Sequence, residues 1–176
     1  THKTVVNIPA RGLYPLRDLF IAGEDKMIVG CDAAGLELRM LCHFLEDPGY
    51  TEIVLNGDPH SANQEMAGLA TRDNAKTWLY AKLYGSGIPN LARQHGIPIS
   101  HATVSVQKFN KALPALPRLE ERVQSAGQRG YFILVDGRRA RIRRKNRTLM
   151  EHTMLNVLLQ GTGSLVMKWA LKLAEE

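Results

Sequence analysis

The spacing of apolar residues divides the first half of the chain into one short strand and several helices. Residues 27–31 form an apolar run of strand length that ends at Asp32. Apolar residues then recur at helical spacing over residues 34–46. The Asn-Gly-Asp-Pro sequence of residues 56–59 indicates a turn, and Ser61 is well placed as the N-cap of the helix that follows it.

Helical spacing also dominates the second half of the chain. It predicts helices over residues 71–84, 101–112 and 115–129, the last two separated by Pro114. A β-hairpin is expected over residues 131–143, because Asp136-Gly137 is a favoured hairpin turn. A long helix should follow from about residue 148, broken at residues 161–163 by two glycines. The pattern therefore predicts a mainly helical α+β protein without internal repeats.

The predicted helix over residues 71–84 carries an unusual face. Arg72, Lys76, Tyr80 and Tyr84 are spaced one helical turn apart, so two cations precede two aromatic rings along one side. The rise from Arg72 to Tyr80 is roughly 12 Å at about 1.5 Å per residue, comparable to an extended nucleoside triphosphate. The cations lie toward the helix N-terminus, where the helix dipole also favours phosphate. This order predicts a nucleotide site.

Charge is concentrated in one segment. The formal net charge is +6, and seven of the 23 lysines and arginines fall within residues 138–147, which contain none of the 17 acidic residues. The rest of the chain is close to neutral. Such a patch indicates a polyanionic partner, most naturally nucleic acid. A solvated charged surface is the alternative interpretation.

The bulk composition is that of a folded protein with one core. The chain has 176 residues, of which 44% are hydrophobic and 23% charged. No run of eighteen or more apolar residues occurs, so no membrane span and a cytoplasmic location are expected. Cys31 and Cys42 lie in apolar surroundings without metal-type spacing, and both are interpreted as buried thiols in a reducing compartment.

Other polar residues have two interpretations each. Asp32 follows a predicted strand, where a carboxylate can hold Mg²⁺ together with the Ala33 carbonyl, or can simply cap the next helix. His60 closes a turn and can donate to phosphate or remain a surface turn residue. Asn156 and Gln160, four residues apart after His152, can meet bases and sugars or satisfy buried backbone groups.

Taken together, these segments resemble the family A DNA polymerases, the bacterial DNA polymerase I type. Residues 32–39, Asp-Ala-Ala-Gly-Leu-Glu-Leu-Arg, resemble motif A, and Arg72, Lys76, Tyr80, Tyr84 and Gly85 have the spacing of motif B, the nucleotide-binding helix of the fingers. The wording of motif A and of Arg-Asp-Asn-Ala-Lys at residues 72–76 is most similar to the replicative polymerases of short-tailed phages. Further segments follow in the family's order and extend the resemblance over essentially the whole chain: Asp58-Pro-His60, Asp136-Gly-Arg-Arg139, and Asn156 with Gln160-Gly-Thr162.

The resemblance implies template-directed nucleotidyl transfer with two Mg²⁺ ions. It implies that Asp32 and the Ala33 carbonyl bind metal and that Glu37 is the steric gate against a ribose 2′-hydroxyl. The remaining roles fall on the predicted nucleotide helix and on DNA-facing residues. Arg72, Lys76 and His60 would bind the triphosphate, Lys76 would be the general acid, and Tyr80 would stack on the nucleotide. Tyr84 and Gly85 would border the templating base, and Arg138, Arg139, Asn156 and Gln160 would contact primer–template DNA.

The resemblance also implies parts that this sequence does not contain. The family's second metal carboxylate lies in a His-Asp-Glu motif, which is absent from these residues, and the thumb is absent as well. Asp136, in the sequence Val135-Asp136, is a tempting substitute for this second carboxylate, but it is better explained as part of the hairpin turn. We therefore expect little or no polymerisation by this chain alone. A cloning boundary, an incomplete gene and a second polypeptide that supplies the missing motif and thumb are three open explanations.

The expected architecture is the fingers and part of the palm of a right-hand polymerase. Residues 1–58 would be partial palm with motif A, residues 59–130 fingers, residues 131–147 a basic hairpin and loop, and residues 148–176 a palm helix. The expected partners are primer–template DNA and a deoxynucleoside triphosphate, in a bacterial or phage-infected cell. The alternative function is a non-catalytic nucleic-acid-binding fragment of such a polymerase.

Overall fold

The computed structural model describes residues 19–30 and 32–175 and divides the chain into two compact units, residues 1–34 and residues 35–176. In the described part of the first unit the backbone is irregular, with a turn closed by a hydrogen bond from Lys26 N to Gly23 O. The strand predicted over residues 27–31 is not formed in residues 27–30, whose side chains are exposed. An extended segment needs a neighbouring strand for its backbone hydrogen bonds, and no described strand pairs with this one. Cys31 lies outside the described residues.

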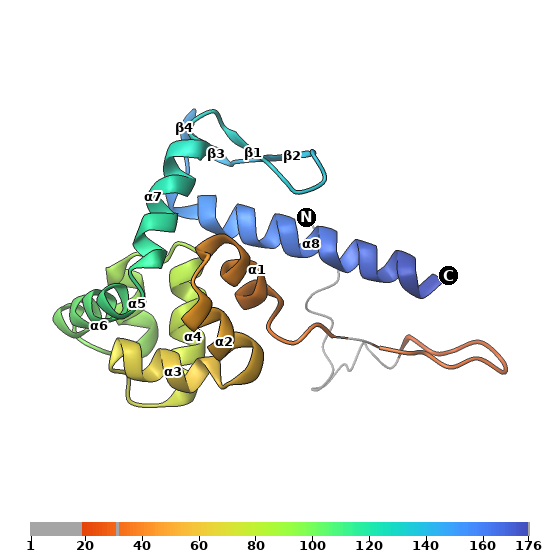
Figure 1. Ribbon diagram of the computed structural model, residues 1–176, viewed down its shortest axis with the longest axis horizontal. Coiled ribbons are helices and arrows are strands. Elements are labelled where there is room, and N and C mark those ends of the chain that lie inside the picture. Colours follow the sequence, from red (N-terminus) through yellow and green to blue (C-terminus); the bar gives the residue numbers. More distant parts are fainter. Residues whose placement is uncertain (1–18, 31, 176) are drawn as a thin grey trace. The chain divides into compact units, whose positions relative to one another are not determined.

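The second unit is built mainly from helices (Figure 1). The described helices are α1 (Leu36–Leu45), α2 (Pro48–Asn56), α3 (Pro59–Ala67), α4 (Arg72–Leu83), α5 (Ile88–His95), α6 (Ile99–Ala112), α7 (Ala115–Gly127), the 3-10 helix η2 (Glu151–Thr153) and α8 (Met154–Glu175). Two antiparallel hairpins interrupt this series: β1 (Tyr131–Ile133) with β2 (Arg139–Arg141), and β3 (Arg144–Lys145) with β4 (Thr148–Leu149). The mainly helical α+β prediction is confirmed.

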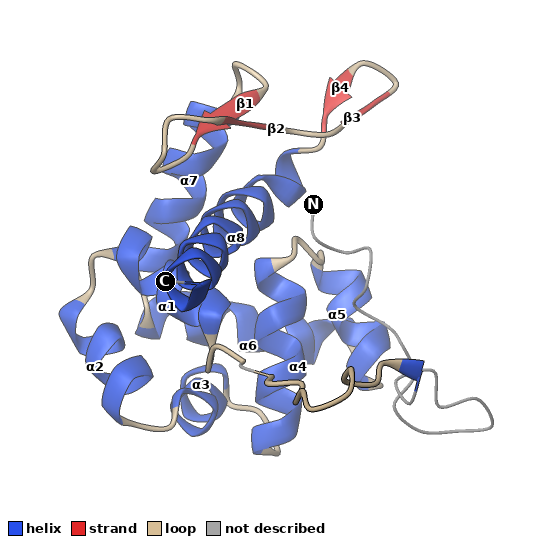
Figure 2. Cartoon of the chain, turned by 90° about the vertical axis from the view of Figure 1, so that its right-hand side faces the viewer, coloured by secondary structure: helices blue, strands red, loops and turns tan. Residues whose placement is uncertain are grey.

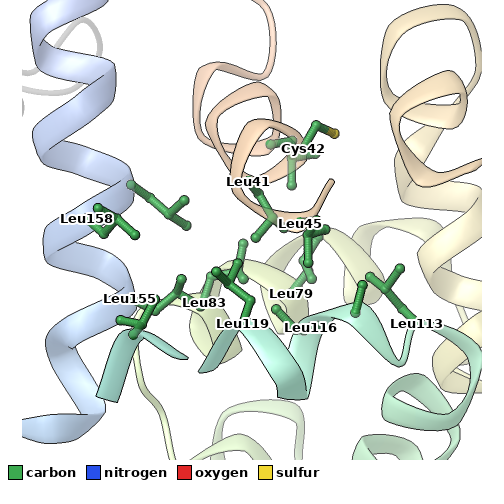
Figure 3. Close-up of a cluster of buried hydrophobic side chains, with 14 of the residues drawn as sticks. Leu41, Cys42, Leu45, Leu79, Leu83, Leu113, Leu116, Leu119, Leu155 and Leu158 are labelled. Atoms are coloured by element: carbon green, nitrogen blue, oxygen red, sulfur yellow. The ribbon is translucent and has the colours of Figure 1, made fainter. Parts of the chain in front are cut away.

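Leucines from four helical regions form the core of the second unit. Figure 3 shows α1, α4, α7 and α8 converging through Leu41, Cys42, Leu45, Leu79, Leu83, Leu113, Leu116, Leu119, Leu155 and Leu158. Burying such a side chain contributes roughly 1.5–3 kcal/mol, so the four helices are held together mainly by apolar contact. Cys42 is a free, buried thiol, and burial raises its pKa. The interpretation of Cys42 as a buried thiol is confirmed.

Helix caps explain several boundaries. The Asp47 carboxylate accepts from Tyr50 N at 2.9 Å and Pro48 occupies the first turn of α2, a helix that the apolar pattern did not predict. Asp58, not Ser61, caps α3 by accepting from His60 N at 3.0 Å. The Ser61 hydroxyl instead donates to the Asp58 carboxylate at 2.7 Å, so the predicted N-cap was wrong by one turn.

The long helix α8 runs without a break, contrary to the prediction at residues 161–163. A Cβ on Gly161 would lie 3.1 Å from Leu134, and one on Gly163 would lie 3.2 Å from Leu36. The two glycines therefore allow the hairpin and α1 to pack closely on α8, and this packing offsets their poor helix propensity. The helix also begins at Met154, later than predicted, because two additional strands and η2 precede it.

Candidate functional site

Helix α4 forms where the sequence predicts it and displays the expected face. The Thr71 hydroxyl caps its first turn by accepting from Asn74 N at 3.2 Å. One side of the helix is fully buried, and Trp78 meets Phe109 of α6 edge-on at 5.3 Å between ring centroids. This burial fixes the rotation of α4, so that the opposite side presents its cations and tyrosines away from the core.

A groove of about 640 Å³ runs along that exposed side. Lys76, Tyr80 and Tyr84 line it from α4, and Gln94 and His95 line it near the end of α5. The Tyr80 and Tyr84 rings lie 6.0 Å apart between centroids and are tilted by 47°. Three of the predicted site residues are therefore gathered in one opening with a cationic and an aromatic part.

His60, at the start of α3, lies beside this groove. Its ring centroid is 6.3 Å from that of Tyr80. Burial lowers the pKa of His60, and the positive charges of Arg72 and Lys76 lower it further. Its Nδ1 is buried and has no hydrogen-bond partner among the described residues. The imidazole is thus positioned near the cations with one ring nitrogen available.

Arg72 is engaged in the structure. Its Nε and Nη2 atoms donate to the Asp58 carboxylate at 2.7 and 3.0 Å. This ion pair joins the N-terminal ends of α3 and α4, and the hydrogen bond from Arg72 holds the pKa of Asp58 well below its usual range. Arg72 therefore lies next to His60, but Asp58 competes with any phosphate that it would bind.

Three polar residues come together here: Glu37 of α1, Tyr84 at the C-cap of α4, and Gln160 of α8. The Tyr84 hydroxyl donates to the Glu37 carboxylate at 3.3 Å. Burial raises the pKa of Tyr84, the negative charge of Glu37 raises it further, and a hydrogen bond with Gln160 opposes the increase. The predicted gate residue is therefore hydrogen-bonded to Tyr84, the tyrosine that is expected to border the templating base.

Gly85 has a structural requirement of its own. Its φ is +84°, and a Cβ on it would lie 1.8 Å from the carbonyl oxygen of His152. The end of α4 thus touches the backbone that leads into α8. Asn156, in the first turn of α8, is half-buried and its Oδ1 has no hydrogen-bond partner in the described part of the chain.

One ion pair between α4 and α7 was not predicted from the sequence. Lys82 Nζ donates to Glu120 of α7 at 3.0 Å, and the Lys82 side chain is only 10% exposed. Lys82 lies one turn after Trp78, on the buried side of α4, and a lysine at such a position indicates an acidic partner nearby. Gln94 and His95, which line the groove, carry no comparable signal in the sequence.

The two hairpin arginines predicted to bind DNA lie in different environments. Arg138 pairs with Asp136 across the hairpin turn at 2.5 Å. The Arg139 guanidinium lies over the Tyr131 ring, 4.8 Å from its centroid, and Arg129 lies near the same ring at 5.2 Å. The interpretation of Asp136 as a turn residue agrees with this geometry, because Gly137 beside it has a φ of +82°.

Asp32 and Ala33 belong to the first unit. Asp32 is exposed and in irregular backbone, and it does not cap α1, whose N-cap is Gly35. The described residues contain no group of three or more His, Cys, Asp or Glu side chains that could hold a metal. Asp32 and the Ala33 carbonyl are hard oxygen donors that suit Mg²⁺, an ion that commonly takes its remaining ligands from phosphates and water. They fit part of a metal site.

No helix in the described part of the chain is long and apolar enough to cross a membrane.

Comparison with known proteins gives the family of this chain. The family model for DNA polymerase family A matches residues 3–176. The DNA-directed DNA polymerase of Escherichia phage Phieco32 is 36% identical over 181 residues, covering 86% of this chain and 30% of that protein. The corresponding enzyme of Escherichia phage T7 is 36% identical over 174 residues, covering 88% of this chain and 24% of that protein.

A solved structure is similar along nearly the whole length. It is the POL domain of Pol1 from M. smegmatis in complex with DNA primer-template and dNTP, with a TM-score of 0.75 and 25% identity. The similarity covers 97% of this chain and 35% of that one, so the chain spans about a third or less of these relatives. Because the family model matches almost every residue, the chain belongs to DNA polymerase family A.

Proposed function

We propose that this chain is the nucleotide-binding part of a DNA-directed DNA polymerase, which transfers nucleotides to a primer 3′ end as a template directs. The observation that carries this proposal is the exposed side of α4, where Lys76, Tyr80 and Tyr84 share one groove beside His60. Family membership and the similarity to a polymerase domain in complex with primer-template and dNTP support it.

The cationic part of the groove suits a triphosphate. Lys76 is exposed on α4, so its ammonium group can reach phosphate oxygens and give a proton to the leaving pyrophosphate. His60 can donate a hydrogen bond from its ring, and Arg72 can exchange Asp58 for phosphate because both partners of that pair are about half exposed. The Tyr80 ring, one turn beyond Lys76, then lies where the nucleoside would stack.

The Glu37 carboxylate suits a steric gate. The Tyr84 hydroxyl holds it at 3.3 Å, which restricts the positions that the carboxylate can take beside the sugar. An additional 2′-hydroxyl would have to displace this restrained group. The gate role thus depends on the hydrogen bond between Tyr84 and Glu37.

The DNA-facing role is assigned to residues at the end of α4, on α8 and on the first hairpin. Tyr84 and Gly85 would border the templating base, and Asn156, with its unpartnered Oδ1, would meet the minor groove one turn from Gln160. Arg139 would contact the DNA backbone from the hairpin, and Arg138 would do so in competition with Asp136.

Asp32 and the Ala33 carbonyl would hold Mg²⁺, an ion that commonly takes its remaining ligands from phosphates and water. When bound, the metal supplies electrostatic stabilisation of the oxygens in the phosphoryl transfer. The second carboxylate would come from a His-Asp-Glu motif on a further segment or on a second polypeptide, which would also supply the thumb. In this assignment residues 1–58 belong to the palm, residues 59–130 to the fingers, and residues 148–176 to a palm helix, in a protein that acts in the bacterial or phage-infected cytoplasm.

Nucleotide binding by the chain tests the proposal directly. Lys76→Ala should weaken dNTP affinity by about 10-fold to 100-fold, because a charge-assisted hydrogen bond contributes roughly 1.5–3 kcal/mol. Lys111→Ala is the matched control, since Lys111 is an exposed lysine on α6 outside the groove. Equal dNTP affinities for the two variants, measured by calorimetric titration, would contradict the nucleotide site.

A primer-extension assay separates the enzyme from a non-catalytic fragment. Two samples are compared, both with Mg²⁺: the chain by itself, and the chain together with a polypeptide that carries the His-Asp-Glu motif and thumb. Extension in the combined sample supports the proposed activity. Its absence, with dNTP binding intact, would favour the non-catalytic nucleic-acid-binding alternative.

A further inference from the structure

Two hairpins in tandem carry the most basic segment of the chain. Figure 2 shows both hairpins at one end of α7, beyond the start of α8. The ladder of the first hairpin pairs Tyr131 with Arg141 and Ile133 with Arg139. The second pairs Arg144 with Leu149 and Lys145 with Thr148, and it was predicted only as a loop.

The cations point outward along this segment. Ile142 is buried and Ala140 is half-buried, whereas Arg139, Arg141 and Arg143 between and beside them are exposed. Alternation of this kind places every second side chain on the solvent face, about 6.6 Å from the next. We define the basic ribbon as the six exposed cations Arg139, Arg141, Arg143, Arg144, Lys145 and Arg147.

The positive charge of the basic ribbon is not neutralised by the described part of the protein. None of its six cations forms an ion pair with a described carboxylate. The carboxylate of Asp136 is paired with Arg138, which we therefore leave outside the ribbon, and that of Glu151 accepts from Gln128. The Arg144 guanidinium donates a hydrogen bond to the carbonyl oxygen of Arg147 at 3.3 Å. The ribbon is therefore a surface on which like charges are held close together.

The tip of the second hairpin gives an independent indication. Asn146 and Arg147 form its two-residue turn with φ values of +49° and +68°. Such turns favour asparagine followed by glycine, and arginine is disfavoured in this left-handed conformation. An arginine at the position where glycine would fold best indicates that its charge has a use.

We propose that the β3–β4 end of the basic ribbon binds the sugar–phosphate backbone of duplex DNA, adding a contact region to those assigned above. This inference rests on the proposed function, which makes DNA the expected polyanion. Duplex is favoured over single-stranded DNA because stacking on exposed rings is typical of single-strand sites. The ring in this region, Tyr131, is half-buried and has Arg129 and Arg139 beside it.

The salt dependence of duplex binding measures these contacts. The variant Arg144→Gln/Lys145→Gln/Arg147→Gln should flatten the slope of log affinity against log salt by about 2.7, because each neutralised phosphate contributes about 0.9. The control Lys108→Gln/Lys111→Gln/Arg118→Gln removes equal charge from exposed positions of α6 and α7. It should leave the slope near that of the unmodified chain. Equal slopes for the two triple variants would overturn the proposal, as would tighter binding of a single strand of the same length.

Arg147→Gly separates folding from binding. Glycine suits the turn better, so the melting temperature should stay the same or rise. The slope of log duplex affinity against log salt should become flatter by about 0.9. An unchanged slope in this variant would also overturn the role of Arg147. The dNTP titration of Lys76→Ala uses a different element and ligand, so failure of the nucleotide site and failure of the basic ribbon are distinguished.

Discussion

Arg72 and Lys76, both cations of the same helix face, are prepared for a ligand in different ways. Arg72 donates two hydrogen bonds to Asp58, whereas Lys76 lies exposed in the groove. A bidentate pair fixes the guanidinium in place, yet an exposed pair is weak enough for a phosphate to displace. In the proposed function, Asp58 would keep Arg72 oriented before a nucleotide binds, whereas Lys76 would be free to contact the nucleotide directly.

His60 gives a pH-dependent prediction at the same scale. Burial and the neighbouring cations lower its folded pKa below the usual value of about 6.5, so the unfolded chain takes up the proton first as pH falls. The stabilising contribution is therefore complete above about pH 6.5 and is lost as pH falls through the folded pKa. Urea unfolding across this range should show a smaller acid loss of unfolding free energy in His60→Gln than in the unmodified chain.

His95 gives a second test of this pH dependence, because burial alone lowers its pKa in the same direction. His95→Gln should also reduce the acid loss. If the unfolding free energy of His60→Gln showed the same pH dependence as that of the unmodified chain, the prediction that the folded protein lowers the pKa of His60 would be contradicted.

At the scale of elements, Gly85 joins the end of α4 to the start of α8. Gly85→Ala should lower the free energy of unfolding by more than about 2 kcal/mol, because the left-handed backbone costs roughly 1–2 kcal/mol and the new Cβ would overlap the His152 carbonyl. Gly137→Ala is the matched control: Gly137 has a φ of +82°, and a Cβ added to it would meet no described atom within 4 Å. Chemical denaturation should therefore show a smaller loss for Gly137→Ala, and equal losses would exclude the steric part of the argument.

Local signals decided which elements could be predicted from sequence. Helix α4 has a threonine cap, a regular apolar side and a glycine after its last turn, and its predicted bounds agree with the structure. The first hairpin was also predicted from a local signal, the Asp136-Gly137 turn. The errors came from tertiary effects. Helix α8 is continuous because Leu134 and Leu36 pack against its two glycines. Residues 27–30 do not form the predicted strand because no described strand pairs with them.

The site was predictable to the extent that it lies on one helix. Lys76, Tyr80 and Tyr84 share the groove because helical spacing places them on one side. The bond from Tyr84 to Glu37 and the Lys82–Glu120 pair join residues that are distant in sequence, and no local pattern determines such contacts. The second hairpin was missed because its turn, Asn146-Arg147, lacks the glycine that usually marks one.

At the scale of the whole molecule, the proposed chemistry is divided between two units. Asp32 belongs to the first unit, and the groove along α4 belongs entirely to the second. In the combined extension assay, Asp32→Asn should reduce activity by roughly 100-fold or more, because it removes a proposed metal ligand. Metal-free dNTP and duplex affinities should remain unchanged, since the residues proposed for them lie in the other unit.

Asp25→Asn is the matched control for this prediction, because Asp25 is another exposed carboxylate of the first unit. It should leave extension unaffected. Equal activity of the Asp25→Asn and Asp32→Asn variants would contradict the metal-binding assignment of Asp32.

The glycines of α8 also bear on how this unit forms. Before Leu134 and Leu36 pack against them, Gly161 and Gly163 are two weak points in the middle of the helix. The predicted break is absent from the folded helix, but these two residues are where we expect α8 to be least helical before docking. We therefore expect completion of α8 to be coupled to the packing of α1 and the first hairpin, so that the helix becomes continuous only as the second unit assembles.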